Sequence, residues 1–187
     1  MGRPLREIGE RGVIEIILGC LEVMPGMPIP FGDDVSAVNL PDGRVAVLKA
    51  DMLVGETDVP PGMSLRQAAR KAVVMNVSDL AAKGVQPIAI LASIGLPSNL
   101  REEEVRQIGM GLNDGAREYG AYIIGGDTNE ASDLVISCMA FGVAPKDQLI
   151  KRDGAKPGDI LAVTGLFGKT SAGLKILLER LPAPQRI

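Results

Sequence analysis

Histidine and tryptophan are absent from this sequence of 187 residues, and aromatic residues make up only 3% of it. The absence of histidine excludes Ser-His-Asp and Cys-His catalysis, and also His-rich zinc sites, within these residues. With so few aromatic side chains, stacking platforms for single-stranded nucleic acid are not expected. Chemistry must therefore rest on carboxylates, Lys and Arg, hydroxyl groups, backbone N–H groups and a bound metal. Oxygen ligands of this kind favour magnesium or calcium.

Cysteines, net charge and long apolar runs are also scarce. Cys20 and Cys138 lie far apart and form no metal motif, which indicates free thiols in a reducing compartment. A net charge of -3 provides no basic footprint, so no nucleic-acid partner is expected. No apolar run is long enough to span a bilayer, and no signal-peptide pattern is present. We therefore expect a cytoplasmic protein that does not bind a membrane.

The most informative stretch of the sequence is residues 64–84, whose pattern predicts a single amphipathic helix. Ser64 can cap its start, because the hydroxyl can accept from the free N–H groups of the first turn, and Gly84 can end it. At about 100° per residue, the apolar side chains of this stretch share one face. They are Leu65, Ala68, Ala69, Ala72, Val73 and Leu80.

Two polar residues, Asn76 and Asp79, fall on the same apolar face, and their spacing of three makes them neighbours. A carboxylate that faces a core is costly unless it is paired, hydrogen-bonded or bound to a cation. Asp79 therefore needs a partner, which is either a metal ion or a side chain such as Arg44 or Lys49. Asn76 either orients Asp79 or bonds to nearby backbone, and the sequence leaves both alternatives open.

The hydrophobic pattern predicts an α+β fold with helices packed on one side of a mainly antiparallel sheet. Residues 35–40 and 44–50 are expected to form a hairpin, because Pro-Asp-Gly separates them, and the second strand is expected to end at Asp51. Residues 121–124 predict a short strand that leads into the loop 125–128. The other expected elements are strands at 87–96 and 134–143, a helix at 5–21, and a helix that Pro97-Ser98-Asn99 caps and that runs to about Tyr119. Glu102, Glu103 and Glu104 are expected in the first turn of that last helix, where the dipole favours negative charge.

A boundary at Ala144-Pro145 divides the sequence into two expected domains. Residues 1–144 form the first, and residues 145–187 are the beginning of a second, α/β domain. The second part offers a strand at 160–164 and a helix at 169–181. One strand and one helix cannot bury both of their faces alone. They are expected to pack on the first domain, on another chain or on further sequence.

Four aspartates form a candidate binding constellation. Asp34 and Asp127 each follow a glycine-containing loop, Asp51 is expected at a strand end, and Asp79 faces a core. Taken singly, the loop aspartates can be turn residues and Asp51 can be a cap. Magnesium in phosphate sites, however, is held by a few carboxylates together with phosphate oxygens and water. In a sequence without histidine, the four together favour a magnesium–phosphate site.

These residues lie in segments that resemble thiamine-monophosphate kinase, which belongs to the superfamily of aminoimidazole ribonucleotide synthetase and selenophosphate synthetase. The similarity runs from about Gly32 to Gly173, in order and with the family's spacing. The segments that carry it are Gly32-Asp33-Asp34, Asp51-Met52-Leu53-Val54, Ala69-Arg70-Lys71-Ala72, Asn76-Val77-Ser78-Asp79-Leu80-Ala81-Ala82-Lys83-Gly84, Gly125-Gly126-Asp127-Thr128 and Arg152-Asp153-Gly154-Ala155-Lys156-Pro157-Gly158-Asp159.

The resemblance implies magnesium-dependent transfer of the γ-phosphate of ATP to thiamine monophosphate, which gives thiamine diphosphate. The acceptor is already a phosphate anion, so no general base is needed, in agreement with the missing histidine. It also implies a homodimer in which the sheets of two first domains pair to form a barrel. The implied metal ligands are Asp34, Asp51, Asp79 and Asp127, the residues near ATP are Gly126, Asp127 and Arg152, and the residue at the family's substrate position is Asp58.

Three departures from the family pattern bear on these expectations. Lys49-Ala50 stands where the family usually has Ser-Thr, which places a cation near the metals, and Asp58 stands where the family usually has a substrate-binding histidine. The family's second domain also continues well beyond Ile187, with an Asp-Gly magnesium motif and an acidic substrate motif. Two alternatives therefore stay open: another ATP-dependent enzyme of the superfamily, or a non-catalytic module for nucleotide binding or dimerisation.

Overall fold

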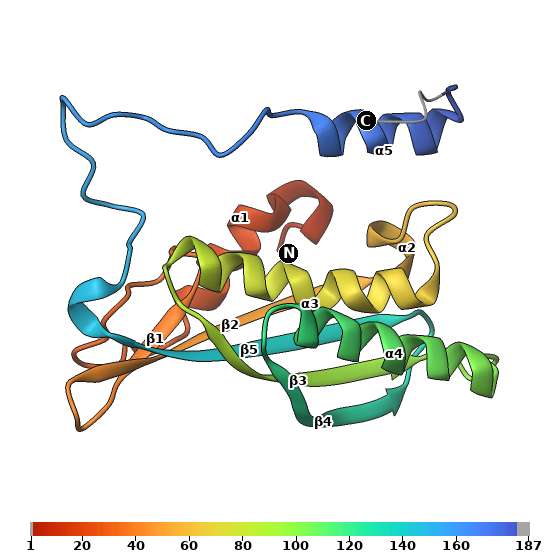
Figure 1. Cartoon of the computed structure of the whole chain (residues 1–187), viewed down its shortest axis with the longest axis horizontal. Coiled ribbons are helices and arrows are strands. Elements are labelled where there is room, and N and C mark those ends of the chain that lie inside the picture. The colour runs from red at the N-terminus through yellow and green to blue at the C-terminus, as the bar shows by residue number, and fades with distance from the viewer. Residues whose placement is uncertain (1, 183–187) are drawn as a thin grey trace.

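A five-stranded sheet forms the centre of the computed structural model, which describes residues 2–182 (Figure 1). The strands lie in the order β1-β2-β5-β3-β4. Three of the four pairings are antiparallel, and the pairing of β3 with β4 is parallel. The expected mainly antiparallel sheet is thus confirmed. The strands are β1 (Ser36–Asn39), β2 (Arg44–Val54), β3 (Pro87–Leu96), β4 (Tyr122–Glu130) and β5 (Val135–Pro145).

Two long helices, α3 and α4, lie side by side on one face of this sheet (Figure 1). Gly111 of α4 allows their close approach, because a Cβ atom there would overlap the backbone carbonyl oxygen of Arg66 on α3. The expected α+β class, with helices on one side of the sheet, is therefore confirmed. The helices are α1 (Leu5–Leu18), α2 (Gly55–Asp58), α3 (Leu65–Ala82), α4 (Glu102–Glu118), the 3-10 helix η1 (Lys146–Gln148) and α5 (Lys169–Glu179).

The core lies between the sheet and α3, and strand alternation decides which residues enter it. On β2, Val45, Val47 and Leu53 are fully buried, while Met52 on the opposite face is 56% exposed. Because successive side chains of a strand point to opposite faces, Lys49 and Asp51 belong to the same face as the buried valines. The sheet thereby directs one lysine and one aspartate towards the helix layer.

The helix predicted for residues 64–84 is confirmed. The Ser64 hydroxyl accepts from the backbone N–H of Gln67 at 3.3 Å, and the Gln67 side chain accepts from the N–H of Ser64 at 2.9 Å, which makes a capping box. The cap expected for the next helix at Pro97-Ser98-Asn99 is wrong, but its expected first turn at Glu102, Glu103 and Glu104 is confirmed. That helix begins at Glu102, where the Glu104 carboxylate accepts from the N–H of Arg101 at 2.9 Å.

Three strand predictions need correction. β2 does not end at Asp51 but continues to Val54, because β5 pairs with it along this whole length. Likewise, Gly125–Thr128 is not a loop after a strand but part of β4, which β3 pairs as far as Glu130. The strand expected at 160–164 is wrong, since these residues have no neighbouring strand with which to pair.

The residues after β5 run out along the body of the molecule, and α5 lies beyond α3 on the side away from the sheet (Figure 1). Ile160 and Leu161 are 93% and 95% exposed, and α5 has no buried residue. The division at 144/145 stays a prediction, and residues 183–187 of the expected second domain lie outside the described residues. Among the helices formed by residues 2–182, none has both the length and the apolar character needed to cross a membrane.

Candidate functional site

The sheet-facing side of α3 carries Asn76, Asp79 and Lys83, at positions i, i+3 and i+7, which share one face of a helix. Asn76 is fully buried. Its side-chain oxygen accepts from the backbone N–H of Asp51 at 2.9 Å, and its NH₂ group donates to the carbonyl oxygen of Ala72 at 2.9 Å. Of the two alternatives for Asn76, bonding to backbone is therefore the observed one, and it fixes α3 to β2 at Asp51.

Lys49 lies between two of the predicted metal ligands. Its Nζ atom is 3.0 Å from Asp51 Oδ1 and 2.7 Å from Asp79 Oδ2. Burial opposes the charged form of Lys49, but the hydrogen bonds to Asp79 and Asp51 outweigh burial and raise its pKa above the ordinary value. Of the partners that the sequence left open for Asp79, the Lys49 side chain is the one that the structure shows, and the role of Asp79 as a metal ligand stays a prediction. The expected placement of Asp79 within the core is wrong, because its side chain is 29% exposed at the edge of the core.

Lys83 forms a second bridge, which the sequence reasoning did not find. Its side chain is only 3% exposed, and its Nζ atom is 2.5 Å from Asp33 Oδ1 and 3.0 Å from Asp34 Oδ2. Burial lowers the pKa of Lys83, but the hydrogen bonds to Asp33 and Asp34 outweigh it and raise that pKa. The available signal was the spacing, since Lys83 lies four residues after Asp79 on the same face of α3.

Arg152 comes from far along the chain to the same loop. Its backbone N–H donates to Asp33 Oδ2 at 3.2 Å, and its guanidinium group donates to the carbonyl oxygen of Gly32 at 3.2 Å. The guanidinium group also lies 3.5 Å from Asp34 Oδ1. The structure therefore brings the predicted ATP residue Arg152 next to the predicted metal ligand Asp34. The Arg152 side chain is 62% exposed, so it remains accessible to a ligand.

Gly126 and Asp127 lie on β4, at the far edge of the sheet from β1. Register places Gly126 in the same row as Asp51, with Cys138 and Ala92 between them. Three strand spacings of about 4.8 Å separate β2 from β4 by about 14 Å, so Asp127 does not join the bridges around Lys49 and Lys83. Gly126 has a structural requirement as well, because a Cβ atom there would overlap the carbonyl oxygen of Ala92.

Asp58, the predicted substrate residue, closes the short helix α2. Its carboxylate accepts from the backbone N–H of Val54 at 2.8 Å and from the Thr57 hydroxyl at 3.3 Å. The ammonium group of Lys71 donates to the backbone carbonyl of Asp58 at 2.6 Å. Sequence reasoning did not assign these local bonds, which hold Asp58 in the turn after β2. Its role towards a substrate stays a prediction.

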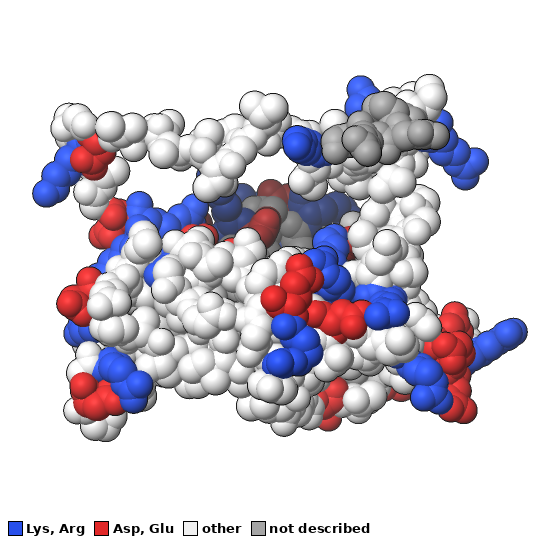
Figure 2. All heavy atoms as spheres, viewed as in Figure 1, with Lys and Arg blue, Asp and Glu red and all other residues white. Residues whose placement is uncertain are grey.

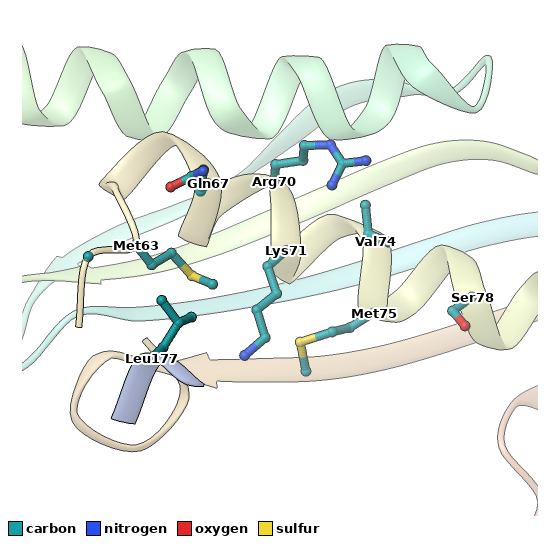
Figure 3. Close-up of a pocket in the computed structure, with 9 residues that line it drawn as sticks. Met63, Gln67, Arg70, Lys71, Val74, Met75, Ser78 and Leu177 are labelled. Carbon is teal, nitrogen blue, oxygen red and sulfur yellow. The ribbon is translucent and has the colours of Figure 1, made fainter. Parts of the chain in front are cut away.

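A cavity of about 680 Å³ lies between α3 and α5, and a neighbouring cavity of about 900 Å³ extends it to Asp58. In Figure 3, Lys71 and Met75 extend from α3 away from α4, and Leu177 of α5 lies across from them. Arg70 points the other way, towards α4, where it makes a bidentate ion pair with Glu118 at 2.6–2.9 Å. Lys71 lines both cavities, and its ammonium group is the one that donates to the Asp58 carbonyl oxygen.

Charges of both signs are interspersed over the visible face of the molecule, without a large patch of either sign (Figure 2). Within residues 2–182, no three acidic or cysteine side chains converge closely enough to hold a metal ion. The carboxylates have the oxygen chemistry that Mg²⁺ prefers, but the space between Asp51 and Asp79 is taken by the Lys49 ammonium. A metal fits the position of Nζ poorly, whereas Asp127 is exposed, and Asp34 is partly exposed although Lys83 contacts one of its oxygens at 3.0 Å.

Comparison with known proteins gives a consistent result. The family profile described as AIR synthase related protein, N-terminal domain, matches residues 32–144. Thiamine-monophosphate kinase of Pyrococcus horikoshii is 43% identical over 157 residues, which is 84% of this chain and 50% of the relative. Thiamine-monophosphate kinase of Nitrosopumilus maritimus is 43% identical over 148 residues, which is 79% of this chain and 46% of the relative.

A solved structure agrees with these sequence relatives. The structure described as AaThiL complexed with AMPPCP and TMP superposes with a TM-score of 0.87 and 28% sequence identity. The match covers 100% of this chain and 58% of that chain. The resemblance to thiamine-monophosphate kinase is therefore confirmed. The chain spans about half the length of the curated relatives that it matches.

Proposed function

The chain belongs to the family of AIR synthase related proteins, and we propose that it forms the N-terminal part of a thiamine-monophosphate kinase. The reaction is transfer of the γ-phosphate of ATP to thiamine monophosphate, with thiamine diphosphate and ADP as products. The observation that carries this proposal is the likeness, over the whole chain, to a structure described as a complex with AMPPCP and TMP. The relatives at 43% identity support the same reaction over that of other superfamily members.

The chemistry suits the residues that are present. A phosphate oxygen of thiamine monophosphate forms a bond to the γ-phosphorus, and the bond from that phosphorus to the β–γ bridging oxygen breaks, with the electron pair leaving on ADP. Because the attacking oxygen is already an anion, no histidine is needed as a general base. The protein's task is to position two anionic substrates and to offset their charges. Bound magnesium ions supply part of that offset.

Asp34 and Asp127 are the carboxylates that we assign to magnesium. The Asp34 side chain is 33% exposed and Asp127 is exposed, so both can reach a metal–nucleotide complex. Lys83 positions Asp34 by its ion pair at 3.0 Å. Arg152 and the backbone of Gly126 contact the phosphates of ATP, for which the planar, five-donor fork of Arg is well suited.

Thiamine monophosphate binds in the cavity between α3 and α5. Lys71 lines this cavity, and its ammonium group, which also donates to the Asp58 carbonyl oxygen at 2.6 Å, offers a cation for the phosphate of the substrate. Asp58 lines the extension of the cavity, and its carboxylate already accepts the N–H of Val54. That bond turns the carboxylate towards the protein backbone, which reduces its repulsion of a phosphate.

The open face of the sheet is the surface that we assign to a homodimer. Met52 on this face is 56% exposed, and the helices cover only the opposite face. Pairing of two such faces would remove this apolar surface from water, at about 25 cal/mol per Å² of apolar area. We place the reaction in the cytoplasm, where Cys20 and Cys138, which are both free thiols, remain reduced.

The test is product formation by the natural protein that contains this sequence. It is incubated with ATP, thiamine monophosphate and Mg²⁺, and thiamine compounds are separated by chromatography. We expect thiamine diphosphate and ADP in equal amounts, and neither product when EDTA is present. Unphosphorylated thiamine serves as the matched acceptor control, and we expect no product from it. ATP binding without any thiamine diphosphate would instead support the non-catalytic nucleotide-binding alternative.

A further inference from the structure

We propose that Lys49 is a permanent cation that takes the place of one metal ion between Asp51 and Asp79. Its Nζ atom contacts a carboxylate oxygen of each residue, at 3.0 Å and 2.7 Å. The lysine side chain is only 16% exposed, so these contacts are shielded from water more than those of a surface ion pair. The inference rests on the proposed function in one respect, namely that other carboxylates of this chain bind magnesium.

Three independent features hold the lysine in this position. β2 places Lys49 two residues before Asp51, so strand alternation puts both side chains on the face towards α3. Asn76 of α3 fixes the backbone of Asp51 through the hydrogen bond at 2.9 Å. Asp79 lies three residues after Asn76 and therefore on the same side of α3. The two carboxylates and the ammonium group are thus fixed by two elements, β2 and α3, whose positions do not depend on a ligand.

A metal ion cannot share this position with the ammonium group. Mg²⁺ binds carboxylate oxygens at about 2.0–2.1 Å, so an ion bound to the two oxygens that Lys49 contacts, Asp51 Oδ1 and Asp79 Oδ2, would lie in the space that Nζ occupies. Two cations at such a separation would also repel each other strongly in a partly buried site. Lys83 likewise contacts Asp34 Oδ2 at 3.0 Å, but it bridges to Asp33 and not to a second predicted metal ligand. Asp34 Oδ1, which lies 3.5 Å from the exposed Arg152 side chain, can therefore still meet an ion. We infer that Asp51 and Asp79 are charge-balanced by Lys49, and that the metals bind elsewhere.

The test counts Mn²⁺ ions in the presence of AMPPCP, by electron paramagnetic resonance of free Mn²⁺ during titration. The unaltered protein is compared with Lys49→Ser, which removes the ammonium, and with Lys49→Arg, which keeps a cation. We expect Lys49→Ser to bind one Mn²⁺ more per chain than the unaltered protein, and Lys49→Arg to match the unaltered protein. Circular dichroism verifies that each variant is folded.

A second measurement needs no substitution and decides the question even if Lys49→Ser does not fold. Crystals of the unaltered protein are grown with Mn²⁺ and AMPPCP, and anomalous scattering locates the ions. We expect no peak between Asp51 and Asp79. A peak there, or equal Mn²⁺ counts in folded Lys49→Ser and in the unaltered protein, would overturn the inference while leaving the proposed kinase intact. If Mn²⁺ binds to none of these proteins, the inference and the metal-dependent function both fall.

Discussion

Replacing Lys83 with Met tests whether the bridge from α3 to the loop before β1 holds the fold together. The Lys83 and Asp33 side chains are 3% and 6% exposed, so this ion pair is buried. Methionine keeps most of the aliphatic stem that packs in the core and removes only the charge. The substitution therefore leaves the Asp33 carboxylate buried without its counter-ion, and it takes one cationic contact from Asp34.

Breaking a buried pair by removing one partner costs roughly 3–5 kcal/mol of unfolding free energy. Asp33 keeps two hydrogen bonds, from the backbone N–H of Asp34 at 2.6 Å and from that of Arg152 at 3.2 Å. These bonds offset part of the loss, so we expect the lower end of the range, about 3 kcal/mol. At about 2–4 °C per kcal/mol for a chain of this size, the melting temperature should fall by about 6–12 °C.

The assay is urea unfolding followed by circular dichroism, with Lys146→Met as the matched control. Lys146 is exposed, so the same chemical change should shift the unfolding free energy by no more than about 0.5 kcal/mol there. Adding Asp33→Asn to Lys83→Met should recover part of the loss, because the uncompensated charge is then removed. A Lys83→Met variant as stable as the Lys146→Met control would refute the structural role of this bridge.

Three further predictions concern pH, helix packing and assembly. Burial raises the pKa of Asp33, but the bonds from Lys83 and from backbone N–H groups outweigh burial and lower that pKa. The stability that the Asp33 carboxylate contributes is therefore present above about pH 3.9 and should be lost as pH falls through the pKa of Asp33 in the folded protein. The pKa of Lys83 is raised, so the stability that its charged form contributes is present below about pH 10.4 and should be lost as pH rises through the pKa of Lys83 in the folded protein. Urea unfolding at a series of pH values measures both effects. Gly111→Ala should destabilise the protein by about 1–3 kcal/mol, because the added Cβ meets the α3 backbone. Gly109→Ala is the control: no atom lies within 4 Å of its added Cβ, so it should be neutral or slightly stabilising. Equal effects of the two variants in thermal unfolding would contradict the packing argument. Met52→Lys should convert the proposed homodimer to a monomer in light scattering, and a dimer of undiminished stability would place the interface elsewhere.

The parts of the fold that local sequence determines were predictable. The helix α3 has a capping residue, a terminal glycine and a consistent apolar face, and five of the six apolar residues assigned to that face are buried, with Leu65 partly buried. The need of Asp79 for a charged or hydrogen-bonding partner was also predictable, because an unpaired carboxylate beside a core is costly. Lys49, named as one of two candidate side-chain partners beside a metal ion, is the residue that pairs with Asp79.

The parts that depend on distant partners were not predictable to the same degree. The ends of β2 and β4 are set by pairing with β5 and β3, which are far away in the sequence. The bridge of Lys83 requires the loop at Asp33 to reach the end of α3, and periodicity carries no information about that contact. The strand expected at 160–164 shows the reverse case, because a strand-like sequence forms no strand without a neighbour.

The most direct test of the central claim follows the transferred phosphate itself. The natural protein is given ATP labelled at the γ-phosphate, thiamine monophosphate and Mg²⁺, and the label is traced among the products. We expect it in the terminal phosphate of thiamine diphosphate, one per ADP formed. Label found only in inorganic phosphate, or in no product at all while ATP and Mg²⁺ bind, would contradict the assignment of this chain to a thiamine-monophosphate kinase.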